Sequence, residues 1–236
     1  MKYEITQQQI VDYLNTLTYE QQAARLAVWG ARFPNVGNTY FTNGNNYRQM
    51  IKVTTAGTNN TVPAVFGFDN TWNAYLAAGY LNWQDLTSYL DWSGLRPMTE
   101  FEYEKACRGP LTTVANEYPW GSTAVTSTTG PASDWTNSNS NYTIVDGPLF
   151  YCCWNGISQR PGAFAKSTTN RVQAGATYYG ILDMAGNLFE QCVGGAGFDY
   201  SGFTTTNGDG VLTATGSANT VGWPTNGGTN SGTIIR

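Results

Sequence analysis

The residues best suited to chemistry lie between positions 179 and 190, where the sequence reads YGILDMAGNLFE. Two carboxylates, Asp183 and Glu190, stand on either side of Gly186 and Asn187, which both tolerate a positive φ. A tight turn at these two residues would point successive carbonyl oxygens inward. Ca²⁺ takes hard oxygen ligands of this mixed kind in proteins. The alternative is a purely structural turn in which Asp183 caps backbone amides.

The four cysteines are the other reactive side chains, and we expect them to be structural. Cys107 falls on the buried side of a predicted helix, where it would be an inert core thiol, and we expect Cys192 to be buried as well. Cys152 and Cys153 are adjacent, and a bridge between neighbours is strained. Either one of them pairs with Cys107 or Cys192, or both are free. A metal site made of Cys152, Cys153 and Cys192 is not favoured.

Composition excludes several classes of function. The chain contains no histidine, which rules out Ser-His-Asp and Cys-His catalysis and the common histidine-containing zinc sites. A net charge of −4 and 12 scattered Lys and Arg argue against a nucleic-acid partner. No apolar run of about 18 residues occurs, so we predict no membrane span. Only 12% of residues are charged, and Thr, Asn, Ser and Gly supply the polarity, which favours an extracellular or cell-surface location.

Three helices are predicted to position these residues. Capping boxes, in which a Thr is followed three residues later by Gln or Glu, begin helices at Thr6 and Thr99. The other helix follows Asn82 and ends before Gly94. Their apolar faces comprise Ile10, Tyr13, Leu14 and Leu17; Leu86, Tyr89 and Leu90; and Tyr103, Ala106 and Cys107.

Further candidates have more ordinary interpretations. Three glutamates alternate on the last of these helices, where capping and a solvated face are favoured over acid–base chemistry. Two arginines are expected to tie its ends to neighbouring loops. Four tryptophans in loop-rich sequence could stack on a sugar, although packing is expected. These residues are Glu100, Glu102 and Glu104; Arg96 and Arg108; and Trp120, Trp135, Trp154 and Trp223.

Four segments resemble, in the correct order, the signature blocks of the formylglycine-generating enzyme (sulfatase-modifying factor) family. Residues 95–109 are similar to R-L-P-T-E-x-E-W-E-Y-A-A-R-G, and residues 179–190 to G-L-Y-D-M-x-G-N-V-W-E-W. Residues 2–15 and 118–121 are similar to two further blocks, and the resemblance covers about residues 1–193. In this chain Phe189 and Gln191 replace two tryptophans, and Pro97 sits one position early. The resemblance implies an α+β, C-type-lectin-like fold with short twisted antiparallel sheets, a few helices and long irregular loops.

The same resemblance implies a structural calcium ion. Its ligands would be the side chains of Asp183 and Glu190 and the backbone carbonyls of Gly186 and Leu188. The family's catalytic cysteine pair, which binds copper, lies downstream in a segment that opens R-G-G-S. The present sequence ends at Arg236, where that segment would begin. None of the four cysteines can therefore be assigned that role, and we expect no copper and no catalytic residue.

We therefore expect a non-catalytic domain of a secreted or cell-surface protein, acting as a scaffold, an assembly subunit or a binding module. Its partners would be other protein subunits or a surface ligand such as a glycan. Two alternatives stay open. One is a copper-dependent oxidase that converts sulfatase cysteines to formylglycine, and the other is a calcium-dependent carbohydrate-binding module.

The domain organisation is predicted to be a single domain over residues 1–236, incomplete at both ends. No internal repeat or linker divides the sequence, and residues 2–6 are predicted to form a short strand. We expect the chain to start one strand late and to stop before the strand that closes the sheet. It would then be a fragment, or a neighbouring subunit would supply the strand, giving a homo-oligomer or filament.

Overall fold

The computed structural model describes residues 1–27, 50–58, 61–68, 74–123, 158, 160–195, 198–204, 207–224 and 233–235. The elements in these ranges are α1 (Gln7–Thr16), α2 (Tyr19–Ala27), β1 (Lys52–Thr55), β2 (Val65–Gly67), α3 (Trp83–Trp92), α4 (Glu100–Arg108), β3 (Gln191–Val193) and β4 (Thr233–Ile235). The strands form two antiparallel pairs, β1 with β2 and β3 with β4. Mixed helices and small antiparallel sheets agree with the predicted α+β class.

The three predicted helices begin where the sequence places them. At the start of α1, Thr6 Oγ1 accepts from the Gln9 N–H at 3.3 Å, while Gln9 Oε1 accepts from the Thr6 N–H at 2.8 Å. The same reciprocal pair joins Thr99 and Glu102 at the start of α4, at 3.1 and 2.8 Å. Asn82 caps α3 through its side-chain oxygen. Each cap satisfies backbone donors that the first helical turn leaves without partners.

The larger apolar core joins α1, α3 and the β1–β2 pair. Tyr13 of α1 meets Tyr89 of α3 edge to face, with ring centroids 6.1 Å apart. After α3 the chain leaves the helix at Gly94, whose φ of 71° is the left-handed stop that the sequence predicts. The buried residues of this core are Ile10, Val11, Tyr13, Leu14, Leu17, Leu26, Ile51, Val53, Ala64, Phe66, Ala78, Tyr89 and Leu90.

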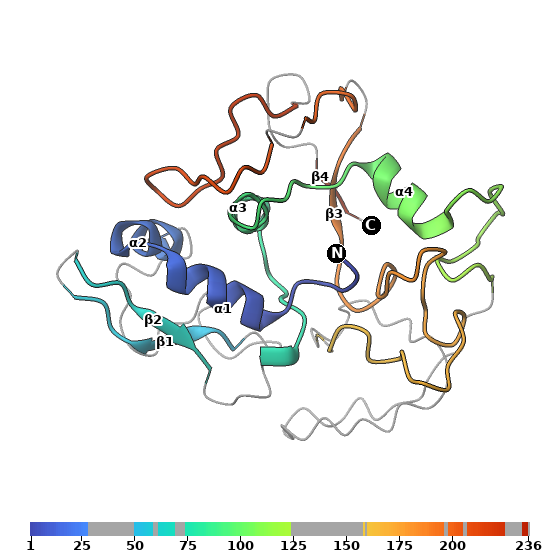
Figure 1. Ribbon diagram of the computed structural model, residues 1–236, viewed down its shortest axis with the longest axis horizontal. Helices are drawn as coiled ribbons and strands as arrows, with labels where there is room; N and C mark the ends of the chain where they lie inside the picture. Colours follow the sequence, from blue (N-terminus) through green and yellow to red (C-terminus); the bar gives the residue numbers. More distant parts are fainter. Residues whose placement is uncertain are drawn as a thin grey trace.

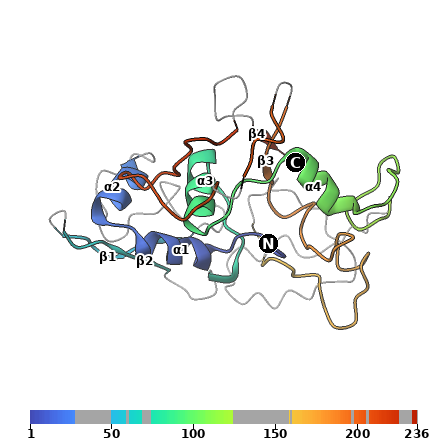
Figure 2. The same ribbon diagram turned by 45° about the horizontal axis from the view of Figure 1, so that its top comes forward.

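A smaller core lies between α4 and β3. It consists of the buried side chains Tyr103, Cys107, Met184 and Cys192. The Val193 N–H donates to the Met98 carbonyl at 3.0 Å, which links the end of β3 to the segment before α4. In Figure 1, α1, α2, β1 and β2 lie on one side of the molecule and α4 on the other, with α3 and the β3–β4 pair between them. The arrangement is the same in the rotated view of Figure 2.

Three features differ from the sequence-based expectations. Residues 2–6 are not a strand, although Thr6 forms a single antiparallel bridge with Ala77. Helix α2 had no counterpart among the predicted elements. Residues 233–235 form β4 and pair with β3, a strand pair that the sequence did not predict.

The C-terminal segment 207–223 packs against α3 through polar contacts. Both carboxylate oxygens of Asp91 accept backbone hydrogen bonds, one from Asp209 at 3.1 Å and one from Asn219 at 2.7 Å. Buried Arg25 of α2 donates to the hydroxyls of Ser88 and Ser217. The segment is thereby joined to two helices.

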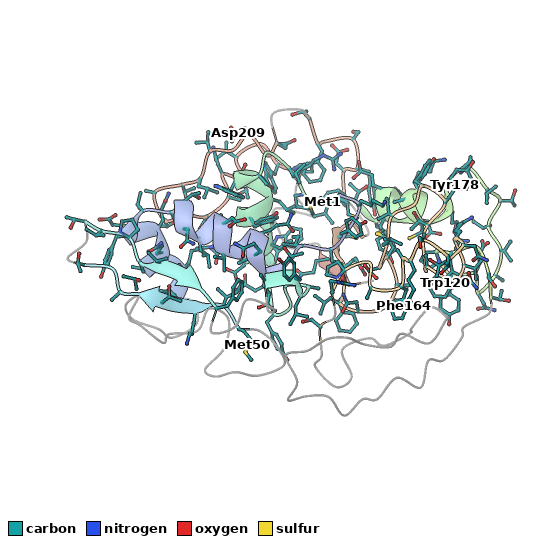
Figure 3. The ribbon with its side chains drawn as sticks, turned by 60° about the horizontal axis from the view of Figure 1, so that its bottom comes forward. Met1, Met50, Trp120, Phe164, Tyr178 and Asp209 are labelled. Carbon is teal, nitrogen blue, oxygen red and sulfur yellow. The ribbon has the colours of Figure 1, made fainter. Side chains whose placement is uncertain are left out.

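The far end of the molecule, beyond α4, carries several aromatic side chains, including Trp120 and Tyr178 (Figure 3). The predicted turn at residues 118–121 is present, because the Gly121 N–H donates to the Tyr118 carbonyl at 2.9 Å. Trp120 is buried and stacks on Tyr118 with ring centroids 4.6 Å apart. None of the helices in the described ranges is long and apolar enough to cross a membrane.

Candidate metal centre

The candidate centre is built on the loop over residues 182–190, which leads directly into β3. Asp183, Gly186 and Asn187 have φ values of 59°, 93° and 56°, all in the left-handed region. The positive φ predicted at Gly186 and Asn187 is therefore present. A left-handed conformation at Asp183 and Asn187 costs energy, and it persists only where surrounding contacts hold it.

Contacts from three distant segments hold this loop. The Leu182 N–H donates to the Lys2 carbonyl at 3.0 Å. The Tyr103 hydroxyl of α4 donates to the Met184 carbonyl. On β3, the Gln191 side chain donates to the Leu81 carbonyl at 2.8 Å. The loop is thus fixed at the meeting point of the N-terminal segment, the start of α3 and α4.

The two predicted carboxylate ligands lie in this loop and are partly buried. Burial raises the pKa of Asp183, and it raises the pKa of Glu190 to about 8. Asp183 Oδ2 accepts a hydrogen bond from the Gly162 backbone N–H. This bond is of the kind that the structural-turn alternative requires, and it leaves Asp183 Oδ1 available for another partner.

A third carboxylate, Glu4, lies at the same place and was not predicted. Its Oε2 accepts from the Asn187 side chain, and its Oε1 accepts from the Leu188 N–H at 3.2 Å. Burial and the negative charges of Asp183 and Glu190 raise the pKa of Glu4 to about 9. Glu4 is separated from Leu188 by 184 positions in the sequence, so no local motif could have indicated the contact.

The oxygen donors of the loop are of the kind that hard cations bind. Within the described ranges, none of the three carboxylates forms an ion pair with Lys or Arg. In the same part of the chain, no three His, Cys, Asp or Glu side chains are grouped closely enough to hold a metal ion. An ion at this loop would therefore rely on the two predicted carboxylates together with carbonyl oxygens and water, all of which suit Ca²⁺. The predicted ligand set of Asp183, Gly186, Leu188 and Glu190 stays a prediction.

The two cysteines in the described part of the chain are core residues, as predicted. Cys107 is 5% exposed and Cys192 is fully buried, and neither is in a disulfide. Burial raises the pKa of each thiol to about 12, so both stay protonated at neutral pH. Cys152 and Cys153 lie outside the described residues.

The remaining candidates have structural surroundings. Glu102 forms an ion pair with Arg96 at 2.6 Å, and Arg108 forms ion pairs with Glu104 and with Glu117 in the following loop. Trp120 and Trp223 are buried, which agrees with packing. Glu100 lies in the first turn of α4, and Trp135 and Trp154 lie outside the described residues.

A family model described as "Sulfatase-modifying factor enzyme 1-like domain" matches residues 1–197. The matched region contains α1 to α4, the loop over residues 182–190 and β3. No curated protein and no solved structure matches the chain. The family resemblance drawn from the sequence is confirmed.

Proposed function

The chain belongs to the sulfatase-modifying factor enzyme 1-like family, and from this premise we propose that it is a non-catalytic, calcium-stabilised domain of a secreted or cell-surface protein. It acts as a scaffold, an assembly subunit or a binding module. Its partners are other protein subunits or a surface ligand such as a glycan. The proposed fold is C-type-lectin-like and comprises one domain over residues 1–236.

The burial of Cys107 and Cys192 carries this proposal. Reactive cysteines act as thiolates in partly exposed, electropositive surroundings. Both of these thiols instead lie in an apolar cluster with Tyr103 and Met184. They are therefore poor candidates for copper ligands or nucleophiles, and the absence of histidine in the sequence removes the usual proton carrier.

The sequence composition supports the proposed location and mode of action. Neutral polar residues cover most of the loop-rich sequence, and only 12% of residues are charged. Long loops on a fixed core are the usual carriers of binding function. The binding surface is therefore proposed to lie on loops, with the two cores holding them in place.

The calcium ion belongs to this proposal as a structural cofactor. It would be held by the side chains of Asp183 and Glu190 and by the carbonyls of Gly186 and Leu188. Its charge would neutralise buried carboxylates that no Lys or Arg of the described residues pairs with. Tyr103 and Lys2 hold the loop in place through their hydrogen bonds to Met184 and Leu182.

Thermal unfolding in calcium and in a chelator tests the cofactor. At a free calcium concentration about 100 times Kd, binding stabilises the folded state by about 2.7 kcal/mol, so Tm is expected to rise. Asp183→Asn keeps an acceptor for the Gly162 N–H but loses the charge, and it should abolish most of this shift. Asp12→Asn, an exposed residue of α1, is the matched control. An unchanged Tm in wild-type protein would contradict the proposal and favour the structural turn.

An aldehyde assay tests the absence of catalysis. The protein is incubated with copper and a peptide containing Cys-x-Pro-x-Arg, and no conversion of the cysteine to formylglycine is expected. Turnover above a copper-only control would reverse the assignment in favour of the oxidase. A glycan array, measured in calcium and in a chelator, tests the alternative of a carbohydrate-binding module. That alternative requires glycan binding that depends on calcium.

A further inference from the structure

The N-terminal segment lies between the candidate metal loop and the middle of the chain. Lys2 accepts from the Leu182 N–H on one side. Ile5 accepts from the Ala78 N–H at 2.8 Å, and the Gln7 N–H donates to the Leu76 carbonyl at 2.9 Å. Glu4 stands between these two sets of contacts. Its side chain is therefore directed by backbone that is fixed before and after it.

The two oxygens of Glu4 engage neighbouring residues of the loop. One accepts from the side chain of Asn187, and the other accepts from the backbone N–H of Leu188. Asn187 has a left-handed backbone, which must be held by its surroundings. The contact with Glu4 helps to hold this conformation, because it fixes both the Asn187 side chain and the peptide group that follows Asn187.

That peptide group lies between the two carbonyls that are expected to bind calcium. Gly186 precedes Asn187, and the Leu188 carbonyl follows the N–H that Glu4 holds. A rotation of this peptide would change the backbone geometry between the two expected carbonyl ligands. The orientation of both carbonyl ligands therefore depends on an acceptor at the position of Glu4.

We propose that Glu4 is a positioning residue for the calcium centre, which holds the Asn187–Leu188 peptide and joins the N-terminal segment to the bound ion. This inference rests on the calcium site proposed above. Glu4 is not assigned as a ligand, in agreement with the lack of a three-carboxylate group within the described residues.

Calcium titration calorimetry, combined with melting in a chelator, tests this role. Glu4→Gln keeps an oxygen acceptor for the Leu188 N–H but loses the charge and the acceptor for Asn187. Because the peptide between the two expected carbonyl ligands would lose part of its restraint, we expect calcium Kd to increase about tenfold. In the chelator, Tm of Glu4→Gln should stay close to that of wild type, because the neutral Gln side chain fits beside the carboxyl groups of Asp183 and Glu190.

Two further variants complete the experiment. Asn187→Gly permits the left-handed backbone and removes the side-chain contact with Glu4, so calcium Kd should also increase, by about tenfold or less, even if Glu4→Gln does not fold. Glu20→Gln removes an exposed carboxylate from α2 and should leave Kd unchanged, which controls for net charge.

The outcomes separate this inference from the calcium proposal. If wild type binds calcium and both Glu4→Gln and Asn187→Gly bind it equally well, the role of Glu4 is overturned while the calcium site stands. A fall in chelator Tm with unchanged Kd would also overturn it, because Glu4 would then serve the fold alone. If wild type binds no calcium, both proposals fail.

Discussion

Asp91 shows how a single buried carboxylate can organise distant backbone. Asp91 is 1% exposed, and its two carboxylate oxygens accept hydrogen bonds from the backbone N–H groups of Asp209 and Asn219. Burial raises the pKa of Asp91, while these backbone donors act to lower it. The donors lie 118 and 128 positions away in the sequence. Asp91 is therefore one of the side chains that attach the C-terminal segment to α3.

Replacement of Asp91 is expected to be strongly destabilising. Asp91→Ala leaves two partly buried N–H groups without this acceptor. An unsatisfied N–H group costs about 1–3 kcal/mol when it is fully buried, so the free energy of unfolding should fall by about 1–3 kcal/mol in total. Asp91→Asn keeps one acceptor oxygen and should lose less. Urea unfolding measures the change, with Asp12→Ala on the exposed face of α1 as control. Similar losses in Asp91→Ala and the control would show that the contact contributes little.

Helix α4 depends on its first turn, where two reciprocal hydrogen bonds join Thr99 and Glu102. Thr99→Ala removes the side-chain acceptor and should lower the free energy of unfolding by about 1 kcal/mol. Thr99→Ser keeps the hydroxyl and should change it by less than about half of that amount. Denaturant unfolding of the two variants side by side isolates the cap. Equal destabilisation by Ala and Ser would instead assign the effect to the buried methyl group of Thr99.

The elements that could be predicted are those with local signals. The caps of α1, α3 and α4 each join residues only three positions apart, so the local sequence is enough to predict them. The left-handed turn at Gly186 and Asn187 was predictable for the same reason. Glu4 and Asp91 were not, because their partners are more than a hundred positions away and carry no motif. Strand β4 likewise pairs with a distant strand, and its Gly-, Thr- and Asn-rich surroundings obscured it.

The molecule as a whole is held together near its N-terminus. One apolar core joins α1 and α3, and the other joins α4 and β3. The N-terminal segment contacts both the metal loop and residues 76–78. In Figure 1 the N-terminus lies beside β3, close to the centre of the molecule. We expect a cation at the metal loop to stabilise the contact between this loop and the N-terminal segment as well as the loop itself.

The pH dependence of stability follows from the carboxylates at this junction. In the metal-free protein the pKa of Glu4 is about 9 and that of Glu190 about 8, against 4.5 for an ordinary Glu side chain. Raised folded-state pKa values mean that the folded protein holds protons that the unfolded chain releases. Their contribution to stability is complete below the unfolded pKa and is lost as pH rises through the folded values. Glu102, whose pKa is lowered to about 2, acts in the opposite direction but only below this window.

In a chelator, Tm is therefore expected to fall as pH rises from about 5 to about 9. Saturating calcium should make Tm less dependent on pH, because the ion binds the deprotonated carboxylates. Calcium affinity should increase over the same interval. Glu190→Gln removes one of the titrating groups and should reduce the slope in chelator, and Glu20→Gln should leave it unchanged. Melting curves at several pH values, with and without calcium, measure these effects. A chelator Tm that stays level or rises across the interval would show that Glu4 and Glu190 are ionised in the metal-free fold, and that these carboxylates need no cation to be buried together.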